Sequence, residues 1–499
     1  MNYQEAIKIF RTMHDKLHAI HHALGVVHYD AATVAPKASA EGRGKTMGIM
    51  TEMSYNIQTA PEVKEAVEWL LSNKDQLTPA EYREVTEFNK SNEFISSIPM
   101  QEYVDYTILI NEAEDVWHRA KNESDADAFL PYLEKIFETN KKFALYYKPD
   151  QKPYDTMLSM YEKGLTMEQA DKFFAVLRSK IVPLLEKCMS VPQVRCDFLS
   201  RTAAIPTQRI FSDYLMEVLT INRDNCGIGE TEHPFTTNFN KKDVRITTHY
   251  HEDALVSSMY SVIHEGGHAM YELHSGDDLE GTFLSGGVSM GIHESQSRFF
   301  ENIIGRSRGF TALIFPKCQE LFPDVFGDVT AEEFYKAVNK AEPSLIRTEA
   351  DELTYALHVL VRYEIEKAVI SGDLAVKDIP TAWNNKYKEY LGVDVPDHGH
   401  GFLQDSHWSG GSIGYFPSYA LGSAYGAQML AKMKETIDVD KCIATGDLAP
   451  ITAWLEEKIW RHGCMYDPGQ LLEMAVGAPF DPAYFTDYLE AKFKEIYNV

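Results

Sequence analysis

Apolar residues recur at three- and four-residue steps along most of the chain, which is the pattern of helices that bury one face. Over the first 25 residues this face consists of six positions: Tyr3, Ile7, Phe10, Leu17, Ile20 and Leu24. Gly25 follows and predicts the end of that helix. Thr78, Thr166 and Thr330 each precede an acid or amide by three residues, which predicts capped helix starts. The pattern therefore predicts a mainly α-helical fold.

Residues 222–251 depart from this pattern, because they combine glycines and a proline with polar turns. Within them, polar and β-branched side chains alternate over residues 243–250, which predicts one or two short strands. Residues 344–369 return to helical spacing and predict one long helix. No repeat or long linker interrupts the chain. We therefore expect a single domain over 1–499, with a helical N-terminal part (1–220) and the candidate chemistry in 221–499.

Charge and composition narrow the possible partners and the compartment. Lys and Arg number 48 against 74 Asp and Glu, a net charge of −26, which repels phosphate backbones and anionic lipid. No apolar run approaches the roughly 20 residues of a membrane span, and the N-terminus has no apolar signal core. Six cysteines without a CxxC pair suit a reducing compartment. We expect a cytoplasmic protein that binds neither nucleic acid nor membrane.

The segment His264-Glu265-Gly266-Gly267-His268 carries the most specific chemistry. Residues four apart share a helix face, so His264 and His268 can direct imidazole nitrogens at one zinc ion. Zinc lowers the pKa of a bound water to about 7, and Glu265 can take its proton as the water attacks a carbonyl. The two glycines cost about 1 kcal/mol each inside a helix. We therefore expect another backbone or the substrate to approach closely there.

A third ligand is predicted at Glu294, which opens a new helical pattern and leaves a fourth position for water. An alternative interpretation makes Glu294 a solvated acid at a helix start, where the helix dipole favours it. Rival ligands lie in or beside a polar, glycine-containing loop: Glu272, Asp277, Asp278 and Glu280.

A di-iron carboxylate bundle is a different metal hypothesis, since Glu265-x-x-His268 fits one of its two helical motifs. The other such spacing, Glu230 to His233, lies in a loop flanked by glycine and proline and not on a helix. This argues against the di-iron site.

Several stretches together resemble the carboxypeptidase Taq family of zinc metallocarboxypeptidases, and they run in family order from residue 233 to about 430. They are His233-Pro234-Phe235, Asp243-x-Arg245-x-Thr247, the 264–268 segment, residues 293–298 and 346–352, and Gly401-x-x-Gln404-Asp405-x-His407-Trp408. One departure is His28-Tyr29-Asp30, where the family has Trp-Asp at a helix end; it bears on packing and not on the metal chemistry.

The resemblance implies a helical fold with a deep substrate groove and a small sheet beside the metal helix. It implies zinc bound by His264, His268 and Glu294, cobalt as a possible substitute, and a homodimer. The implied activity removes single C-terminal residues with broad specificity, commonly sparing a C-terminal proline. Peptides with a free C-terminal carboxylate are the implied partners.

Substrate contacts are also carried over by the resemblance. The expected set is His233, Asp243, Arg245, Thr247, Arg347 and Gln404. Arg347 lies in the predicted long helix, where an arginine among acids is also typical of a salt-bridged face. Arg245 lies on the predicted strand, whose edge could pair with an extended peptide; an ordinary exposed strand charge is the alternative.

Residues 404–419 are dense in glycine and aromatic residues, which is costly to order and typical of a site. By analogy with related helical zinc peptidases, His407 and either Tyr415 or Tyr419 would stabilise the oxyanion. Aromatic core packing is the alternative for each tyrosine. Two other functions stay open: an oligoendopeptidase or dipeptidyl carboxypeptidase with the same zinc chemistry, and an inactive peptide-binding scaffold. A complete set of ligands and base argues against the scaffold.

Overall fold

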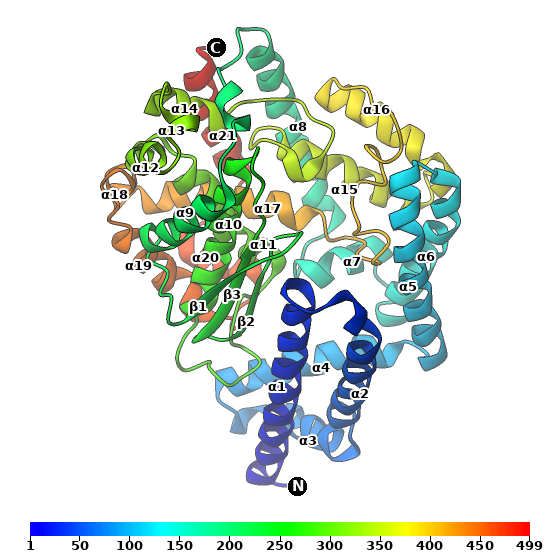
Figure 1. Cartoon of the computed structure of the whole chain (residues 1–499). Coiled ribbons are helices and arrows are strands. Elements are labelled where there is room, and N and C mark those ends of the chain that lie inside the picture. The colour runs from blue at the N-terminus through cyan, green and yellow to red at the C-terminus, as the bar shows by residue number, and fades with distance from the viewer.

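A computed structural model describes residues 1–499 and shows helices surrounding one three-stranded sheet (Figure 1). The N-terminal part is entirely helical. Its helices are α1 (Tyr3–Thr33), α2 (Ala40–Gln58), α3 (Pro61–Ser72), α4 (Pro79–Ser97), α5 (Met100–Glu123), α6 (Ala126–Tyr147), α7 (Pro153–Tyr161), α8 (Met167–Met189) and α9 (Ile205–Val218).

The second part begins with the sheet and continues as helices. Its first elements are β1 (Cys226–Glu230), β2 (Thr236–Asn240), β3 (Asp243–Thr248), α10 (Leu255–Leu273) and α11 (Met290–Arg298), which runs into a π-helical turn at Phe299–Gly305. The rest are α12 (Arg308–Leu321), α13 (Pro323–Phe326), α14 (Ala331–Val338), α15 (Tyr355–Ser371), α16 (Ile379–Leu391), α17 (Pro417–Met433), α18 (Val439–Thr445), α19 (Ala449–Lys458), α20 (Pro468–Val476) and α21 (Ala483–Tyr497). The predicted mainly α fold with a small sheet is confirmed.

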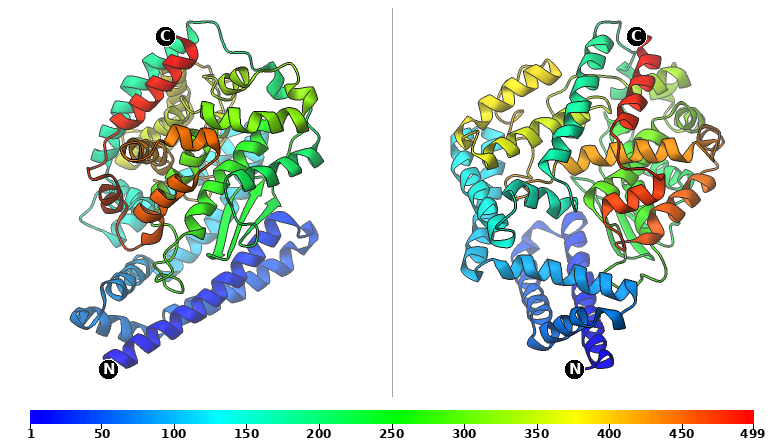
Figure 2. Two further views of the ribbon diagram at one scale, coloured as in Figure 1. Left: turned by 90° about the vertical axis from the view of Figure 1, so that its left-hand side faces the viewer. Right: turned by 180° about the vertical axis from the view of Figure 1, so that it is seen from behind.

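Two hydrophobic cores hold the chain together. The main core joins helices from α5 to α21 with the inner face of the sheet. A smaller core is formed by α1, α3 and α4, and Figure 2 shows α1 and α2 as long helices at one end of the molecule. Phe283, from the loop between α10 and α11, packs against the smaller core, with its ring centroid 5.4 Å from that of Phe88. The N-terminal helices are therefore attached directly to this loop.

The sheet has the order β1-β3-β2, with β1 parallel and β2 antiparallel to the central β3. Val244 and Ile246 of β3 are fully buried, and β3 and β2 both contact α10. Because side chains alternate along a strand, Arg245 between them points to the opposite face. There its guanidinium lies 5.2 Å from the ring centroid of Tyr29 on α1. The sheet is thus enclosed between α10 and the N-terminal helices.

Local sequence signals fix many of these boundaries. All three predicted capping boxes are present, with Thr78, Thr166 and Thr330 each accepting from the backbone N–H three residues on. The predicted strand at 243–250 is confirmed as β3, although three strands form where one or two were expected. No helix has the length and apolar character that crossing a bilayer would require.

Two predicted helix boundaries are wrong, each because of a tertiary or side-chain contact. The first helix continues past Gly25 to Thr33, and a Cβ at Gly25 would lie 2.8 Å from the Phe239 ring, so glycine makes room for β2. The long helix predicted over 344–369 begins only at Tyr355. Before it, the Asp351 carboxylate accepts from the backbone N–H groups of residues 342, 353 and 354 and so competes with helix formation.

Candidate metal centre

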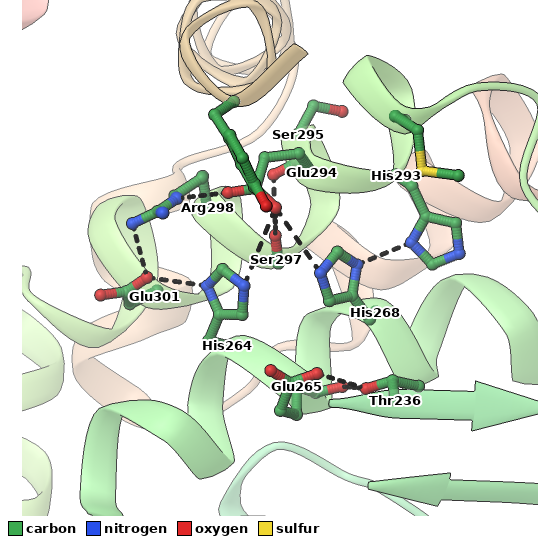
Figure 3. A network of polar contacts seen from close by, with 12 residues as sticks. Thr236, His264, Glu265, His268, His293, Glu294, Ser295, Ser297, Arg298 and Glu301 are labelled. Carbon is green, nitrogen blue, oxygen red and sulfur yellow. Dashed lines mark hydrogen bonds and ion pairs between the residues drawn. The ribbon is translucent and has the colours of Figure 1, made fainter. Parts of the chain in front are cut away.

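His264 and His268 lie one turn apart on α10, with ring centroids 5.0 Å apart (Figure 3). Both rings are partly exposed, while the rest of this turn is buried. The helical spacing predicted from the sequence therefore brings both imidazoles to one accessible face. Neither Nε2 atom takes part in a hydrogen bond within the protein, so both can serve as metal ligands.

Glu294 on α11 faces the two histidines. Its Oε2 lies 3.8 Å from Nε2 of His264 and 3.6 Å from Nε2 of His268. One ligand atom from each residue lies within 4.8 Å of the others, a spacing that suits a single ion. The Arg298 Nε donates to the other carboxylate oxygen of Glu294 at 2.7 Å, which leaves Oε2 directed at the histidines.

The glycine pair inside the metal-binding helix explains how α11 comes so close. A Cβ at Gly267 would lie 2.6 Å from the carbonyl oxygen of Gln296 and 2.7 Å from the Cα of Ser297. Both are backbone atoms of α11 and cannot move away without shifting that helix. The expected close approach of another backbone is therefore found at Gly267. At Gly266 a Cβ would meet only the side-chain tips of Ile221 and Leu219, at 3.0 and 3.2 Å.

His264 is oriented by a carboxylate that sequence reasoning missed. Its Nδ1 lies 2.8 Å from Glu301 Oε2, so the Nδ1 proton is held there and Nε2 keeps its lone pair for a metal. Burial alone would raise the pKa of Glu301, but Arg298, His264 and Arg306 hold it well below its usual range. Glu301 follows Glu294 by seven residues, which is two helical turns, so its position on the same face could have been found.

His268 is oriented differently, by a second imidazole. Its Nδ1 lies 2.6 Å from Nδ1 of His293, whose Nε2 in turn lies 2.6 Å from Glu272 Oε1. Glu272, one of the four rival third ligands in the sequence, is thus separated from His268 by the His293 ring.

Glu265 lies beside the histidines and points toward the sheet (Figure 3). The Thr236 hydroxyl of β2 donates to its Oε2 at 2.6 Å. Burial raises the pKa of the Glu265 carboxyl, although His264 and the Thr236 hydroxyl oppose the shift. A carboxylate of raised pKa is a better proton acceptor, which suits a general base. Thr236 was not predicted, because its contact depends on the register of β2.

The charges around the histidines fit a divalent cation. Four carboxylates gather there and are countered by only two guanidiniums, so two negative charges remain. They are Glu265, Glu272, Glu294 and Glu301 against Arg298 and Arg306. Two imidazole nitrogens and one carboxylate oxygen are also a ligand set suited to zinc.

The predicted oxyanion residues gather around His407. Its Nε2 lies 3.0 Å from the Tyr419 hydroxyl, and its ring centroid lies 5.4 Å from that of Tyr415. Burial and the nearby Arg347 lower the pKa of His407 to about 4, so the ring is neutral at neutral pH. The Tyr415 hydroxyl approaches Met290, the first residue of α11, at 3.8 Å. The 404–419 loop therefore adjoins the helix that carries Glu294.

Arg347 is buried in a charged network beneath this loop. Its Nε and NH2 donate to Asp405 Oδ1 at 3.1 and 2.8 Å, and its NH1 donates to the Tyr355 hydroxyl at 3.0 Å. Arg362 donates to the other oxygen of Asp405 at 2.6 Å. Gln404 accepts from the Arg347 backbone N–H at 2.9 Å and so fixes this turn. Two guanidiniums share one carboxylate, which leaves a buried positive charge.

Tyr355 lies between Arg347 and the metal ligands. The Arg298 guanidinium stacks 4.1 Å from its ring centroid, and Arg347 lies 5.9 Å from the same centroid. Since Arg298 also binds Glu294, one aromatic ring separates Arg347 from the group around the candidate metal. Tyr355 was missed because it was assigned to the middle of a longer helix.

The remaining predicted residues do not join this group. Arg245 donates to Asp243 through Nε and NH2, both at 2.8 Å, on the sheet face away from α10. Its strand is the central one, so it offers no free edge to a peptide. Thr247 is fully buried and holds Phe235 through its hydroxyl at 2.8 Å, while His233 is exposed between β1 and β2.

Comparisons with known proteins place these features in one family. Residues 9–493 match the family described as carboxypeptidase Taq (M32) metallopeptidase. The chain is 40% identical over 477 residues to carboxypeptidase 1 of Bacillus subtilis (strain 168), covering 95% of each chain. It is 34% identical over 498 residues to thermostable carboxypeptidase 1 of Pyrococcus furiosus, covering 98% of each. It also superposes on the crystal structure of the M32 carboxypeptidase from Deinococcus radiodurans R1 with a TM-score of 0.95, at 33% identity, covering 99% of this chain and 100% of that one.

Proposed function

The chain belongs to the carboxypeptidase Taq (M32) metallopeptidase family and is a metallocarboxypeptidase, and we propose that it works with one zinc ion held by His264, His268 and Glu294. The observation that carries this proposal is the convergence of three ligand atoms within 4.8 Å of one another. The surplus of negative charge around them supports a divalent ion. Cobalt, which accepts similar nitrogen and oxygen ligands, is the proposed substitute.

Glu265 is the proposed general base. When bound, zinc supplies Lewis acidity to a water and to the substrate carbonyl. The Glu265 carboxylate takes the proton of the attacking water at an oxygen that the Thr236 hydroxyl orients from 2.6 Å, and then passes it to the leaving amine. Burial, which raises the pKa of Glu265, supports both roles because a proton taken up there is retained long enough to be delivered.

The oxyanion of the reaction is proposed to be stabilised by the His407 group. Tyr419 already shares a hydrogen bond with His407 at 3.0 Å, whereas the Tyr415 hydroxyl approaches the Met290 sulfur, a weak acceptor, at 3.8 Å. Tyr415 is therefore the preferred donor to substrate, with His407 and Tyr419 fixing the loop beside it. A neutral His407, which its lowered pKa favours, adds no charge that would compete with the metal.

Arg347 is the proposed anchor for the substrate's free carboxylate. A guanidinium has five N–H donors, of which three are committed to Asp405 and Tyr355. The two that remain, and the uncompensated positive charge of the Arg347–Arg362–Asp405 group, suit a carboxylate. Both paired donors of Arg245 go to Asp243, on the other face of the sheet, which makes Arg245 the weaker candidate.

The proposal extends to broad specificity for the C-terminal residue, a deep substrate groove, a cytoplasmic location and a homodimer. His233, Asp243, Thr247 and Gln404 remain proposed contributors to the substrate-binding region. For Gln404 and Thr247, the hydrogen bonds to Arg347 and Phe235 support an indirect role through positioning.

Replacement of the base tests the proposal. Glu265→Gln should retain stoichiometric metal, because Glu265 is not a ligand, but should lose turnover by about 10²–10⁴-fold. A chelator should abolish wild-type activity, and added zinc should restore it. Thr236→Val is the matched second variant: it keeps the carboxylate but removes its hydroxyl partner, so a smaller loss is expected. Full turnover by metal-loaded Glu265→Gln would remove Glu265 from the mechanism.

A further inference from the structure

The two candidate histidine ligands differ in what holds them from behind. Nδ1 of His264 meets the Glu301 carboxylate directly, at 2.8 Å. Nδ1 of His268 instead meets Nδ1 of His293 at 2.6 Å, and a carboxylate is reached only through the far side of that ring, at Glu272. The His293 imidazole is therefore hydrogen-bonded at both nitrogens, between the candidate ligand His268 and the Glu272 carboxylate. The role of this intervening ring requires its own explanation.

Proton positions along this line follow from the geometry. His268 must present the lone pair of Nε2 toward Glu294 and the ion, so its single proton is on Nδ1. That proton is donated to His293 Nδ1, which must then be unprotonated. The proton of a neutral His293 is consequently on Nε2 and is donated to Glu272. All three groups are satisfied by this one arrangement, and no imidazole needs to change its charge.

The surroundings hold Glu272 and His293 in these positions. Glu272 is buried and also accepts from Asn238 Nδ2 of β2 at 2.5 Å and from the Gly287 backbone N–H at 3.2 Å. A Cβ at Gly287 would lie 2.4 Å from Cδ2 of the His293 ring, so glycine provides the space that the ring fills. The Tyr271 ring also packs beside the His293 ring, with centroids 5.2 Å apart.

We propose that His293 and Glu272 are positioning residues for the metal centre, forming a relay that fixes the tautomer and orientation of His268. This inference depends on the proposed zinc site. Partners that act on a metal through its ligands typically contribute 10–100-fold to metal affinity. Glu272 therefore supports the site from behind a ring and is not a ligand in place of Glu294.

Zinc affinity of the full-length protein, measured by competition with a chelator of known affinity, tests the relay. His293→Ala and Glu272→Gln should each weaken zinc binding by about 10–100-fold. His274→Ala is the matched control. His274 caps the end of α10, the helix that carries His268, but it bonds only the Met270 carbonyl, so its replacement should leave zinc affinity unchanged. Thermal unfolding of the apo variants shows whether any loss is global.

Chemical rescue separates a relay from simple packing. His293 is partly exposed, so free imidazole can enter the space left by His293→Ala. Added imidazole should restore much of the zinc affinity of His293→Ala but not that of Glu272→Gln, with wild type as the control for imidazole binding to zinc itself. Unchanged affinity in His293→Ala, or a loss that imidazole does not restore, would overturn the relay. If Glu294→Ala also retains zinc, the proposed metal site itself has failed, which is a distinguishable result.

Discussion

Replacing Arg347 tests how the enzyme recognises the end of a peptide. An enzyme that removes one residue must bind the terminal carboxylate, because nothing else marks the terminus. The substitution is Arg347→Ala. Arg245→Ala is the matched control, because Arg245 lies on the sheet face away from α10 and is paired with Asp243. Arg347→Lys is a third variant that keeps the charge but removes the planar fork of donors.

The expected magnitude follows from the donors that Arg347 retains. Two of its N–H groups remain for substrate after its bonds to Asp405 and Tyr355 are counted. A hydrogen bond to a charged group contributes about 1.5–3 kcal/mol, which corresponds to roughly 10- to 150-fold in kcat/KM. Asp405 keeps its 2.6 Å contact with Arg362 in the variant, so it is not left as an unpaired buried charge.

The assay compares kcat/KM for one peptide with a free C-terminal acid and for its amidated form. Wild type should trim the free acid stepwise and leave the amide nearly untouched. In Arg347→Ala, kcat/KM for the free-acid peptide should fall while the low kcat/KM for the amidated peptide stays unchanged, so the ratio of the two falls. Arg245→Ala should preserve this ratio. Equal cleavage of both forms by wild type, or cuts at interior bonds, would refute terminal recognition. If Arg245→Ala alone lowered the ratio of free-acid to amide kcat/KM, Arg245 and not Arg347 would be the residue that binds the terminal carboxylate.

Three further predictions concern the ligand, the helix contact and pH. Glu294→Ala should lower zinc occupancy sharply while the helical circular dichroism signal is kept; stoichiometric zinc would place the third ligand elsewhere. Gly267→Ala should cost about 1–3 kcal/mol in unfolding free energy and weaken zinc binding, whereas Gly266→Ala, which meets only side-chain tips, should be tolerated; equal effects would contradict the backbone contact. Burial raises the pKa of Glu366 to about 7 from its ordinary 4.5, so the folded state holds its proton more tightly and loses stability as pH rises between these values. Glu366→Gln should remove this contribution to the pH dependence. Measured by denaturant unfolding at a series of pH values, the unfolding free energy of the variant relative to wild type should rise by up to about 3 kcal/mol between pH 4.5 and 7. Parallel curves of unfolding free energy against pH for the two proteins would refute this prediction.

Local patterns in the sequence were sufficient wherever the determining contacts are local. The capping boxes at Thr78, Thr166 and Thr330 depend on residues three apart, and each forms as predicted. The spacing of His264 and His268 fixes their shared face in the same way. Glu294 required more, since both its place at the start of a new helical pattern and the order of family motifs were needed to distinguish it from the acids of the preceding loop.

Contacts between distant segments could not be predicted from spacing. Gly25 has the usual character of a helix end, but the Phe239 ring occupies the space beside it and the helix continues. Asp351 has the spacing of a helical residue, but its carboxylate binds three backbone N–H groups and keeps the preceding turn irregular. Arg347 consequently lies in a short turn against Asp405, and not on the face of a long helix.

The metal centre depends on how closely α11 is enclosed by its neighbours, and glycines on both sides set that distance. Gly267 of α10 leaves no space for a Cβ against the α11 backbone at Gln296. On the other side, a Cβ at Gly422 of α17 would lie 2.6 Å from Cγ of Glu294, the proposed ligand itself. A larger residue at Gly267 would therefore press on the α11 backbone alone, whereas one at Gly422 would meet both the Glu294 side chain and, at 2.9 Å, the Glu294 backbone carbonyl carbon. The two variable positions of the HExxH segment are thus not equivalent here, because Gly267 fixes the distance between ligands that come from different helices.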